Sequence, residues 1–171
     1  LIHNFSLIHD DIMDNDRTRR HRPTVWDVYG VGDAIIVGDA LHALAFQVLL
    51  GDAGNARAVS ATERLARATS AMIAGQAQDV ALDRSTTATL EQCIAMEANK
   101  TGALLAQSCA IGAVLGGGSE QGVDALSHYG MSLGIAFQAI DDVLGIWGDT
   151  ALTGKPVGND LREHKKSMPV A

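Results

Sequence analysis

The stretch LIHDDIMDNDRTRRHRPT, residues 7–24, sets the first expectation about the fold. An apolar run typical of the buried side of a helix leads directly into three acidic residues, Asp10, Asp11 and Asp14. Residues four apart lie on one face of a helix, so we expect Asp10 and Asp14 to point the same way and Asp11 to the side. A carboxylate buried without a partner loses its hydration at high cost, so this cluster either faces water or holds cations.

A second acidic pair, Asp141 and Asp142, follows another apolar run inside FQAIDDVLGIWGD, residues 137–149. Gln138 precedes Asp141 by three residues and is expected on the same helix face. Taken alone, such a pair is more often ordinary helix surface than a site. The first cluster has a similar alternative, a solvated acidic helix end.

Positive side chains that suit a phosphate-bearing ligand are spread along the chain: Arg19, Arg20, Lys100, Lys155, Lys165 and Lys166. Arginine can bind phosphate oxygens through two parallel hydrogen bonds. The alternative is a solvated basic loop in which the arginines pair with Asp14 and Asp16.

Three polar residues stand in less obvious places. Lys100 is expected in a helix of apolar and small residues, where its ammonium group must reach solvent or meet an anion. Lys155 belongs to a glycine-containing basic loop that could act as a lid, although it lacks the pattern of a nucleotide phosphate loop. Gln76 shares a helix face with Asp79, either at the edge of the core or lining a cavity.

The composition limits the class of protein. The chain has 171 residues, of which 47% are hydrophobic and only 4% aromatic, which favours one domain of packed helices. A net charge of -7 argues against a general nucleic-acid binder. The two cysteines match no zinc spacing, so we expect free thiols and a reducing, cytoplasmic location. No uncharged apolar run reaches the roughly 18 residues of a membrane span.

Apolar spacing predicts an all-α protein, a single domain over residues 1–171 without strands of useful length. The expected helices cover residues 1–14, 25–29, 34–50, 55–82, 86–115, 119–147 and 161–167. Neither end of the sequence has a helix start or stop signal, so we expect the central part of a longer chain.

Together these residues resemble a known family. Asp10-Asp11-x-x-Asp14, followed by Arg19-Arg20 and Pro23-Thr24, resembles the first aspartate-rich motif of the trans-type polyprenyl diphosphate synthases. The later motifs of that family follow in the same order: Lys100-Thr101-Gly102, Gln138-x-x-Asp141-Asp142, Gly154-Lys155-Pro156-x-Gly158-x-Asp160-Leu161 and Lys165-Lys166. Several independent motifs in order are far more specific than any one of them.

The resemblance implies a helical bundle around a deep central cavity, of the isoprenoid synthase type, usually in a homodimer. It implies the head-to-tail condensation of isopentenyl diphosphate onto an allylic prenyl diphosphate. About three Mg²⁺ ions would be held by Asp10, Asp14 and Asp141 together with substrate phosphates, and Asp11 and Asp142 would act in support.

The substrate-binding candidates are Arg19, Arg20, Gln76, Lys100, Lys155 and Lys165. By the resemblance, Arg19 and Lys100 would bind the allylic diphosphate and Arg20 would contact isopentenyl diphosphate. The Lys100 carbonyl group, the Thr101 hydroxyl group and the Gln138 side chain would supply dipoles for the allylic cation.

Product length depends on the floor of the implied cavity. Phe5 and Ser6 lie five and four residues before Asp10, about one helical turn. A bulky residue at the first place and a small one at the second resemble enzymes that make geranylgeranyl diphosphate, which is the expected product.

Two rival functions stay open. Family members commonly have an aspartate three residues after Asp142, where this chain has Gly145. This departure motivates a non-catalytic subunit that binds prenyl diphosphates or a synthase partner. The other rival, a class I terpene cyclase, shares the first motif but needs an Asn/Asp–Ser/Thr–Glu metal triad, and residues 159–163 lack its spacing.

Overall fold

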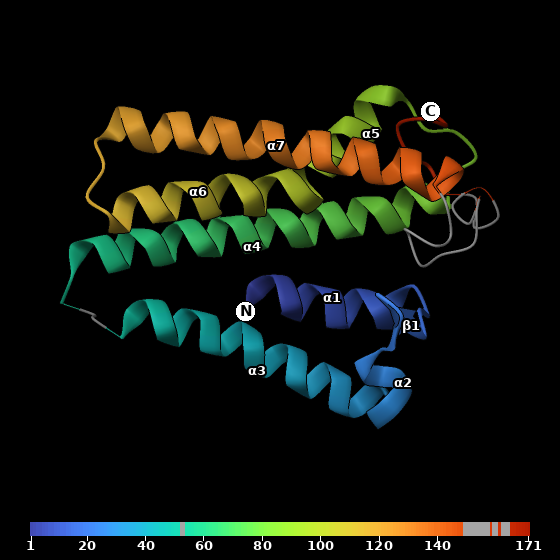
Figure 1. Cartoon of the computed structure of the whole chain (residues 1–171), viewed down its shortest axis with the longest axis horizontal. Helices are drawn as coiled ribbons and strands as arrows, with labels where there is room; N and C mark the ends of the chain where they lie inside the picture. The colour runs from blue at the N-terminus through green and yellow to red at the C-terminus, as the bar shows by residue number, and fades with distance from the viewer. Residues whose placement is uncertain (52–53, 149–157, 159–160, 162–164) are drawn as a thin grey trace. The chain divides into compact units, whose positions relative to one another are not determined.

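The computed structural model describes residues 1–51, 54–148, 158, 161 and 165–171, and most of them are helical (Figure 1). The helices are α1 (Ile2–Met13), α2 (Val25–Tyr29), α3 (Val31–Leu50), α4 (Ala56–Asp83), α5 (Leu90–Glu97), the π-helix η1 (Ala98–Gly102), α6 (Ala103–Leu115) and α7 (Glu120–Trp147). The predicted all-α class is confirmed. The chain forms two compact units, Leu1–Ala53 and Gly54–Ala171, each described by itself; a cavity between helices of both units stays a prediction.

In the first unit, α1 and α2 pack against α3. Gly38 of α3 allows this approach, because a side-chain carbon there would collide with the imidazole ring of His9. The His9 Nε2 atom lies 3.3 Å from the carbonyl oxygen of Ile35, so α1 is anchored on the α3 backbone. The buried apolar face of α1 is formed by Ile2 and Phe5.

In the second unit, α4, α6 and α7 run side by side (Figure 1), and η1 contacts all three helices. Glycines allow the close packing: a side-chain carbon on Gly75 would collide with the Lys100 backbone, and one on Gly134 would come within 2.6 Å of the Gly102 Cα atom. The rest of this core is rich in alanine, which keeps the helices near each other. The low aromatic content noted in the sequence therefore reflects small side chains between closely packed helices.

The helix ends largely agree with the sequence. Asn55 caps α4 by accepting a hydrogen bond from the Arg57 backbone N–H, and Ser119 caps α7 in the same way from Gly122. Thr89 and Gln92 form a capping box at the start of α5. These polar side chains satisfy N–H groups that have no partner inside the helix.

Three predicted elements were wrong in detail. The single helix expected over 86–115 is interrupted by the π-helix η1, and its first regular turn begins only at Leu90. The charged loop contains a short antiparallel hairpin of β1 (Thr18–Arg19) and β2 (Arg22–Pro23). Residues 165–167, expected at the end of a last helix, are not helical.

By length and composition, the helix α3 is long and apolar enough to cross a membrane. Its most apolar 18 residues have a mean hydropathy of 1.6, and 17% of them are buried. Core helices of soluble proteins meet the same criteria, so this helix does not by itself indicate a span. Its apolar side chains are nevertheless widely exposed, including Ile36 at 66% and Val48 at 63%.

Candidate functional site

The first acidic cluster has the predicted arrangement on α1. The backbone N–H of Asp14 donates to the carbonyl oxygen of Asp10 at 2.8 Å, so the two residues lie one helical turn apart. Asp14 caps the end of α1 with its side chain exposed, and Asp10 is half-buried. Asp11 differs from both because it is only 4% exposed.

Asp11 is occupied by an arginine. The Arg19 Nε atom donates to the Asp11 Oδ1 atom at 2.6 Å, and this ion pair is mostly shielded from solvent. Burial raises the pKa of the Asp11 carboxyl group, and the Arg19 hydrogen bond and charge oppose that rise. Because Nε makes this contact, the two terminal nitrogens of Arg19 have no hydrogen-bond partner among the described residues and can bind an anion. The sequence had proposed Asp14 or Asp16 as the alternative partners of this arginine; the described contact is with Asp11.

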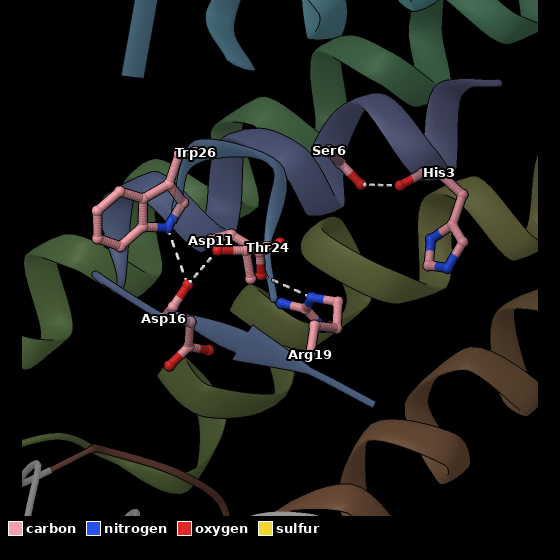
Figure 2. A network of polar contacts seen from close by, with 7 residues as sticks. All are labelled: His3, Ser6, Asp11, Asp16, Arg19, Thr24 and Trp26. Carbon is pink, nitrogen blue, oxygen red and sulfur yellow. Dashed lines mark hydrogen bonds and ion pairs between the residues drawn. The ribbon is translucent and has the colours of Figure 1, made fainter. Parts of the chain in front are cut away.

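The loop that presents Arg19 is held by one carbonyl group. The backbone oxygen of Asp16 accepts hydrogen bonds from the Thr24 Oγ1 atom at 2.9 Å and from the Trp26 Nε1 atom at 2.8 Å (Figure 2). The guanidinium group of Arg17 lies over the Trp26 ring and pairs with Asp27 at 3.2 Å. The segment between α1 and α2 is therefore fixed at several points, although it contains little regular structure.

Arg20 and His21 form the tip of the hairpin in a conformation that favours glycine. Their φ angles are 50° and 62°, in the left-handed region, as in the two-residue turns that best fit a twisted hairpin. For residues other than glycine this conformation costs about 1 kcal/mol each. The strained tip leaves the Arg20 side chain exposed, where a ligand can reach it.

The predicted floor residues lie on α1 as expected. Phe5 is 9% exposed, and its ring centroid lies 4.9 Å from those of both His9 and His42, the latter on α3. Ser6 is half-buried and its Oγ atom donates to the carbonyl oxygen of His3 at 2.9 Å (Figure 2). Phe5 thus packs against α3, and no motif in the sequence had indicated His42 as its neighbour.

In the second unit, Lys100 meets an anion, one of the two outcomes expected for it. Its Nζ atom pairs with the Asp79 Oδ2 atom of α4. Lys100 and Thr101 belong to η1, and single turns of π-helix are frequent at functional sites. Gln76, one turn before Asp79, has both side-chain amide atoms buried without a hydrogen-bond partner among the described residues.

Thr101 begins a chain of hydrogen bonds that reaches the second acidic pair. Its hydroxyl group donates to the Gln138 Oε1 atom at 3.0 Å, and the Gln138 Nε2 atom donates to the Asp142 Oδ1 atom at 3.0 Å. Asp142 is 7% exposed and also accepts from the Met168 backbone N–H at 3.4 Å, whereas Asp141 is exposed. Gln138 was expected to share a face with Asp141, but its bonded partner is Asp142.

One acidic residue of this region was not among the predicted site residues. Glu97 is fully buried, and burial, followed by interaction with Asp142, raises its pKa to about 8. A clue was available, because Cys93 and Met96 precede Glu97 by four and one residues and all three form the buried side of α5. That pattern places a carboxyl group inside the core.

The remaining predicted residues are less informative. Lys155 lies outside the described residues, as does most of the glycine-containing loop around it. Lys165 is half-buried, and Gly145 is half-buried within α7.

The carboxylates of α1 fit a magnesium ion. Mg²⁺ prefers oxygen ligands and is typically held by one or two carboxylates together with substrate phosphates. Asp10 and Asp14 supply two carboxylates one turn apart. Within the described ranges, no three His, Cys, Asp or Glu side chains gather into a metal site by themselves. Two carboxylates completed by a phosphate-bearing substrate are thus the arrangement that these residues can support.

Comparison with known proteins adds to this geometry. The family model of polyprenyl synthetase matches residues 1–171. A geranylgeranyl diphosphate synthase from Mycobacterium tuberculosis is 48% identical over 99% of this chain and 49% of the relative. Other relatives at that level of identity are named farnesyl diphosphate synthase.

Solved structures agree with the fold. A polyprenyl synthetase from Streptomyces coelicolor A3(2) superposes with a TM-score of 0.91 at 56% identity, covering 99% of this chain and 50% of that one. A geranylgeranyl pyrophosphate synthase from Corynebacterium glutamicum, complexed with isoprenyl diphosphate and magnesium, gives 0.85 at 38% identity over 98% and 52%. The chain spans about half the length of the relatives that it matches. The chain belongs to the polyprenyl synthetase family.

Proposed function

We propose that the full-length protein is a Mg²⁺-dependent prenyltransferase that condenses isopentenyl diphosphate with an allylic prenyl diphosphate. The observation that supports this most is the arrangement at the end of α1. Two carboxylates one turn apart, Asp10 and Asp14, stand beside an arginine that Asp11 holds by its Nε atom. Such a set suits a diphosphate that brings metal ions with it.

Charge on the leaving group is the main difficulty of this reaction. The allylic carbon–oxygen bond breaks, and diphosphate departs with growing negative charge. Arg19 and Lys100 would bind that diphosphate, and Arg20 at the hairpin tip would contact isopentenyl diphosphate. Asp10, Asp14 and Asp141 would hold about three Mg²⁺ ions, which would act as Lewis acids and stabilise the negative charge on the diphosphate. This assignment requires Asp10 and Asp141 to face one shared cavity.

The allylic cation needs dipoles and a dry environment. The Thr101 hydroxyl group and the Gln138 amide are linked at 3.0 Å, so their orientations are coupled. With the Lys100 carbonyl group they would stabilise the cation. The departed diphosphate is the proposed base for the last proton, and Gln76 and Lys165 are further proposed substrate contacts.

The proposed product is geranylgeranyl diphosphate. Relatives are named both for this product and for farnesyl diphosphate, so family membership leaves the choice open. The pair of a bulky Phe5 and a small Ser6 supports the longer product. Phe5 is packed against His42, which would make the floor rigid.

We also propose a homodimer in the cytoplasm. The exposed apolar face of α3, with Ile36 and Val48 at its most accessible points, offers a surface that a second copy could cover. The free thiols of Cys93 and Cys109 agree with a reducing compartment. Sedimentation of the Ile36→Glu variant tests the dimer, with the Glu91→Gln variant as control; a dimer unaffected by Ile36→Glu would contradict this interface.

One assay distinguishes the proposed function from its rivals. The full-length protein is incubated with isopentenyl diphosphate, farnesyl diphosphate and Mg²⁺, and the products are extracted. Elongated diphosphates that disappear on adding a chelator support the prenyltransferase. A hydrocarbon made from farnesyl diphosphate alone would indicate a terpene cyclase. A well-folded protein that binds farnesyl diphosphate without turnover would indicate the non-catalytic subunit that Gly145 motivates.

A further inference from the structure

One acidic side chain of α4 has no part in the proposed reaction. Asp79 forms an ion pair with Lys100 of η1, through its Oδ2 atom and the Lys100 Nζ atom. Both side chains are mostly shielded from solvent. Such a pair costs the hydration of two charges, and two apolar side chains in the same places are often as stable or more stable. Stability alone therefore does not account for an ion pair at this position.

The backbone on both sides of the pair is fixed by other contacts. Gly75 of α4 lies against Lys100, where any side-chain carbon would collide with the Lys100 backbone. Beside the pair, the Asn99 Nδ2 atom donates to the Gln78 Oε1 atom at 3.1 Å and joins η1 to α4 a second time. The ion pair is thus not needed to bring the two helices together. It adds the direction of the lysine side chain, which is a flexible four-carbon stem.

Lys100 keeps binding capacity while Asp79 holds it. An ammonium group has three N–H donors, and Asp79 occupies one of them. Among the described residues, the Lys100 ammonium group has no second partner. Its remaining donors can therefore bind phosphate oxygens with the ion pair intact. Arg19 is held in the same way in the first unit, because Asp11 binds its Nε atom and leaves the terminal nitrogens for an anion.

The pair lies close to the second acidic cluster. Thr101, the next residue after Lys100, begins the hydrogen bonds that reach Asp142. The charge of Asp79 is also felt by Glu97, whose pKa is raised by burial, then by Asp142 and then by Asp79. Both members of the ion pair thus belong to the region in which the allylic diphosphate is proposed to bind.

We propose that Asp79 is a positioning residue that holds the Lys100 ammonium group in place for the allylic diphosphate. Because the lysine stem is ordered before the substrate arrives, neither binding nor the chemical step has to bear the entropy cost of ordering it. Asp79 acts only through Lys100, since a carboxylate would itself repel the diphosphate. The inference rests on the proposed function, in which Lys100 binds the leaving diphosphate.

A double-mutant cycle in the full-length protein tests whether Asp79 acts through Lys100. We expect Asp79→Leu to lower kcat/KM for farnesyl diphosphate about thirtyfold, while KM for isopentenyl diphosphate changes less than about twofold. In a Lys100→Leu background the same change should alter kcat/KM less than about threefold, because no ammonium group is left to position. Equal losses in the two backgrounds, an unchanged kcat/KM in Asp79→Leu, or an equal rise in both KM values would overturn the proposal.

Two further variants separate positioning from a merely structural role. Asp79→Asn keeps an oxygen that can accept from the Lys100 Nζ atom, so we expect it to lose only about fivefold in kcat/KM. Glu63→Leu is the matched control, since it removes an acid from an exposed ion pair with Arg67 on the same helix and should leave kcat/KM unchanged. Equal losses in Asp79→Asn and Asp79→Leu would overturn the positioning role.

Thermal unfolding accompanies the cycle. The protein that carries both Asp79→Leu and Lys100→Leu should keep the melting temperature of the wild type, because an apolar pair replaces the ion pair. If Asp79→Leu alone lowers the melting temperature sharply, the cycle is carried out with Asp79→Asn. The same pattern is then expected with smaller losses, and equal losses of Asp79→Asn in the two backgrounds would again overturn the proposal.

Binding of farnesyl diphosphate with Mg²⁺, in the absence of isopentenyl diphosphate, tests the inference without elongation. Calorimetry should give a Kd about tenfold weaker in Asp79→Leu, and less than about twofold weaker when Asp79→Leu is added to Lys100→Leu. An active enzyme without this coupling overturns the inference alone. The coupling in a protein that does not elongate farnesyl diphosphate would instead overturn the proposed function, and leave the role of Asp79 towards a diphosphate established.

Discussion

The two acidic clusters are built alike but neutralised differently. Each has a buried aspartate, Asp11 at 4% and Asp142 at 7% exposure, next to an exposed one, Asp14 or Asp141. Asp11 is balanced by the charge of Arg19, at 2.6 Å. Asp142 is surrounded by neutral donors and by a second carboxyl group.

This difference shows two ways in which a buried carboxylate can orient a neighbouring group. The ion pair in the first unit fixes an arginine for an anion, so the aspartate acts through a cation. In the second unit the aspartate fixes an amide and, through it, a hydroxyl group, so it acts through dipoles. The first arrangement suits a leaving diphosphate and the second suits an allylic cation.

The exposed aspartates should give the largest effect. Asp14→Asn removes one of the two carboxylates proposed to bind Mg²⁺, so we expect kcat to fall about a thousandfold with the melting temperature unchanged. Steady-state assays at saturating Mg²⁺ measure this, with Asp124→Asn, an exposed acid near the start of α7, as the control. Wild-type turnover in Asp14→Asn would remove the first cluster from the site.

Phe5, the proposed floor of the cavity, should control the chain length of the product. Phe5→Ala opens space next to His42, so we expect products at least one isoprene unit longer than those of the wild type, with some loss of stability because Phe5 is buried. Chromatography of the dephosphorylated products measures the chain length. Ser6→Ala is the matched control, and unchanged products in Phe5→Ala would refute the floor.

The ion pair of the first cluster should matter more than its neighbour in the same loop. Arg19→Leu leaves Asp11 buried without a counter-charge, so we expect a loss of about 3 kcal/mol in the free energy of unfolding. Arg17→Leu breaks an exposed pair with Asp27, for which about 0.5 kcal/mol is expected. Urea denaturation of both variants measures the two losses. Similar losses in the free energy of unfolding would mean that the burial of Asp11 does not make its ion pair more important than the exposed one.

Glu97, which interacts with the second cluster, should make the stability of the protein depend on pH. Glu97 has a pKa of about 8 in the folded protein and 4.5 as its ordinary value. Because the folded state keeps a proton that the unfolded chain has released, this contribution to stability is complete below the ordinary value and is lost as the pH rises towards 8. We expect the melting temperature to fall between about pH 5 and pH 8, and to fall less in Glu97→Gln. Parallel curves would contradict a proton on Glu97.

The strained hairpin should give the smallest effect. His21→Gly relieves a φ angle of 62°, so we expect a gain of about 1 kcal/mol in the free energy of unfolding. His128→Gly, on the exposed side of α7, should instead destabilise by a similar amount. Calorimetry distinguishes these signs. A loss of stability in His21→Gly would show that the imidazole ring makes a contact worth more than the strain.

The sequence predicted the regular helices well, because their apolar spacing and caps are local. Ser119 and the glycines after Leu115 mark the start of α7, and the Asp10–Asp14 spacing follows from helix geometry. The same local logic missed the hairpin, since Arg20 and His21 are not residues that predict positive φ angles.

Other parts of the site depend on contacts between distant segments. The pairing of Lys100 with Asp79 and the hydrogen bond from Thr101 to Gln138 join residues 21 and 37 positions apart. No periodicity in one helix reveals such partners. Glu97 was not predicted for another reason. Helical spacing assigns charged residues to the exposed face of a helix, whereas Glu97 lies on the buried face of α5.

The π-turn of η1 also constrains how this sequence can change over time. Each helical residue advances the chain by about 100° around the axis, and η1 holds one wide turn between α5 and α6. Deleting a single residue there would make α5 and α6 one regular α-helix. It would also rotate α5 relative to α6 and turn Glu97 and Cys93 away from the residues that they contact. We therefore expect this segment to tolerate substitutions but not insertions or deletions. Its length should vary less among relatives than its amino-acid sequence.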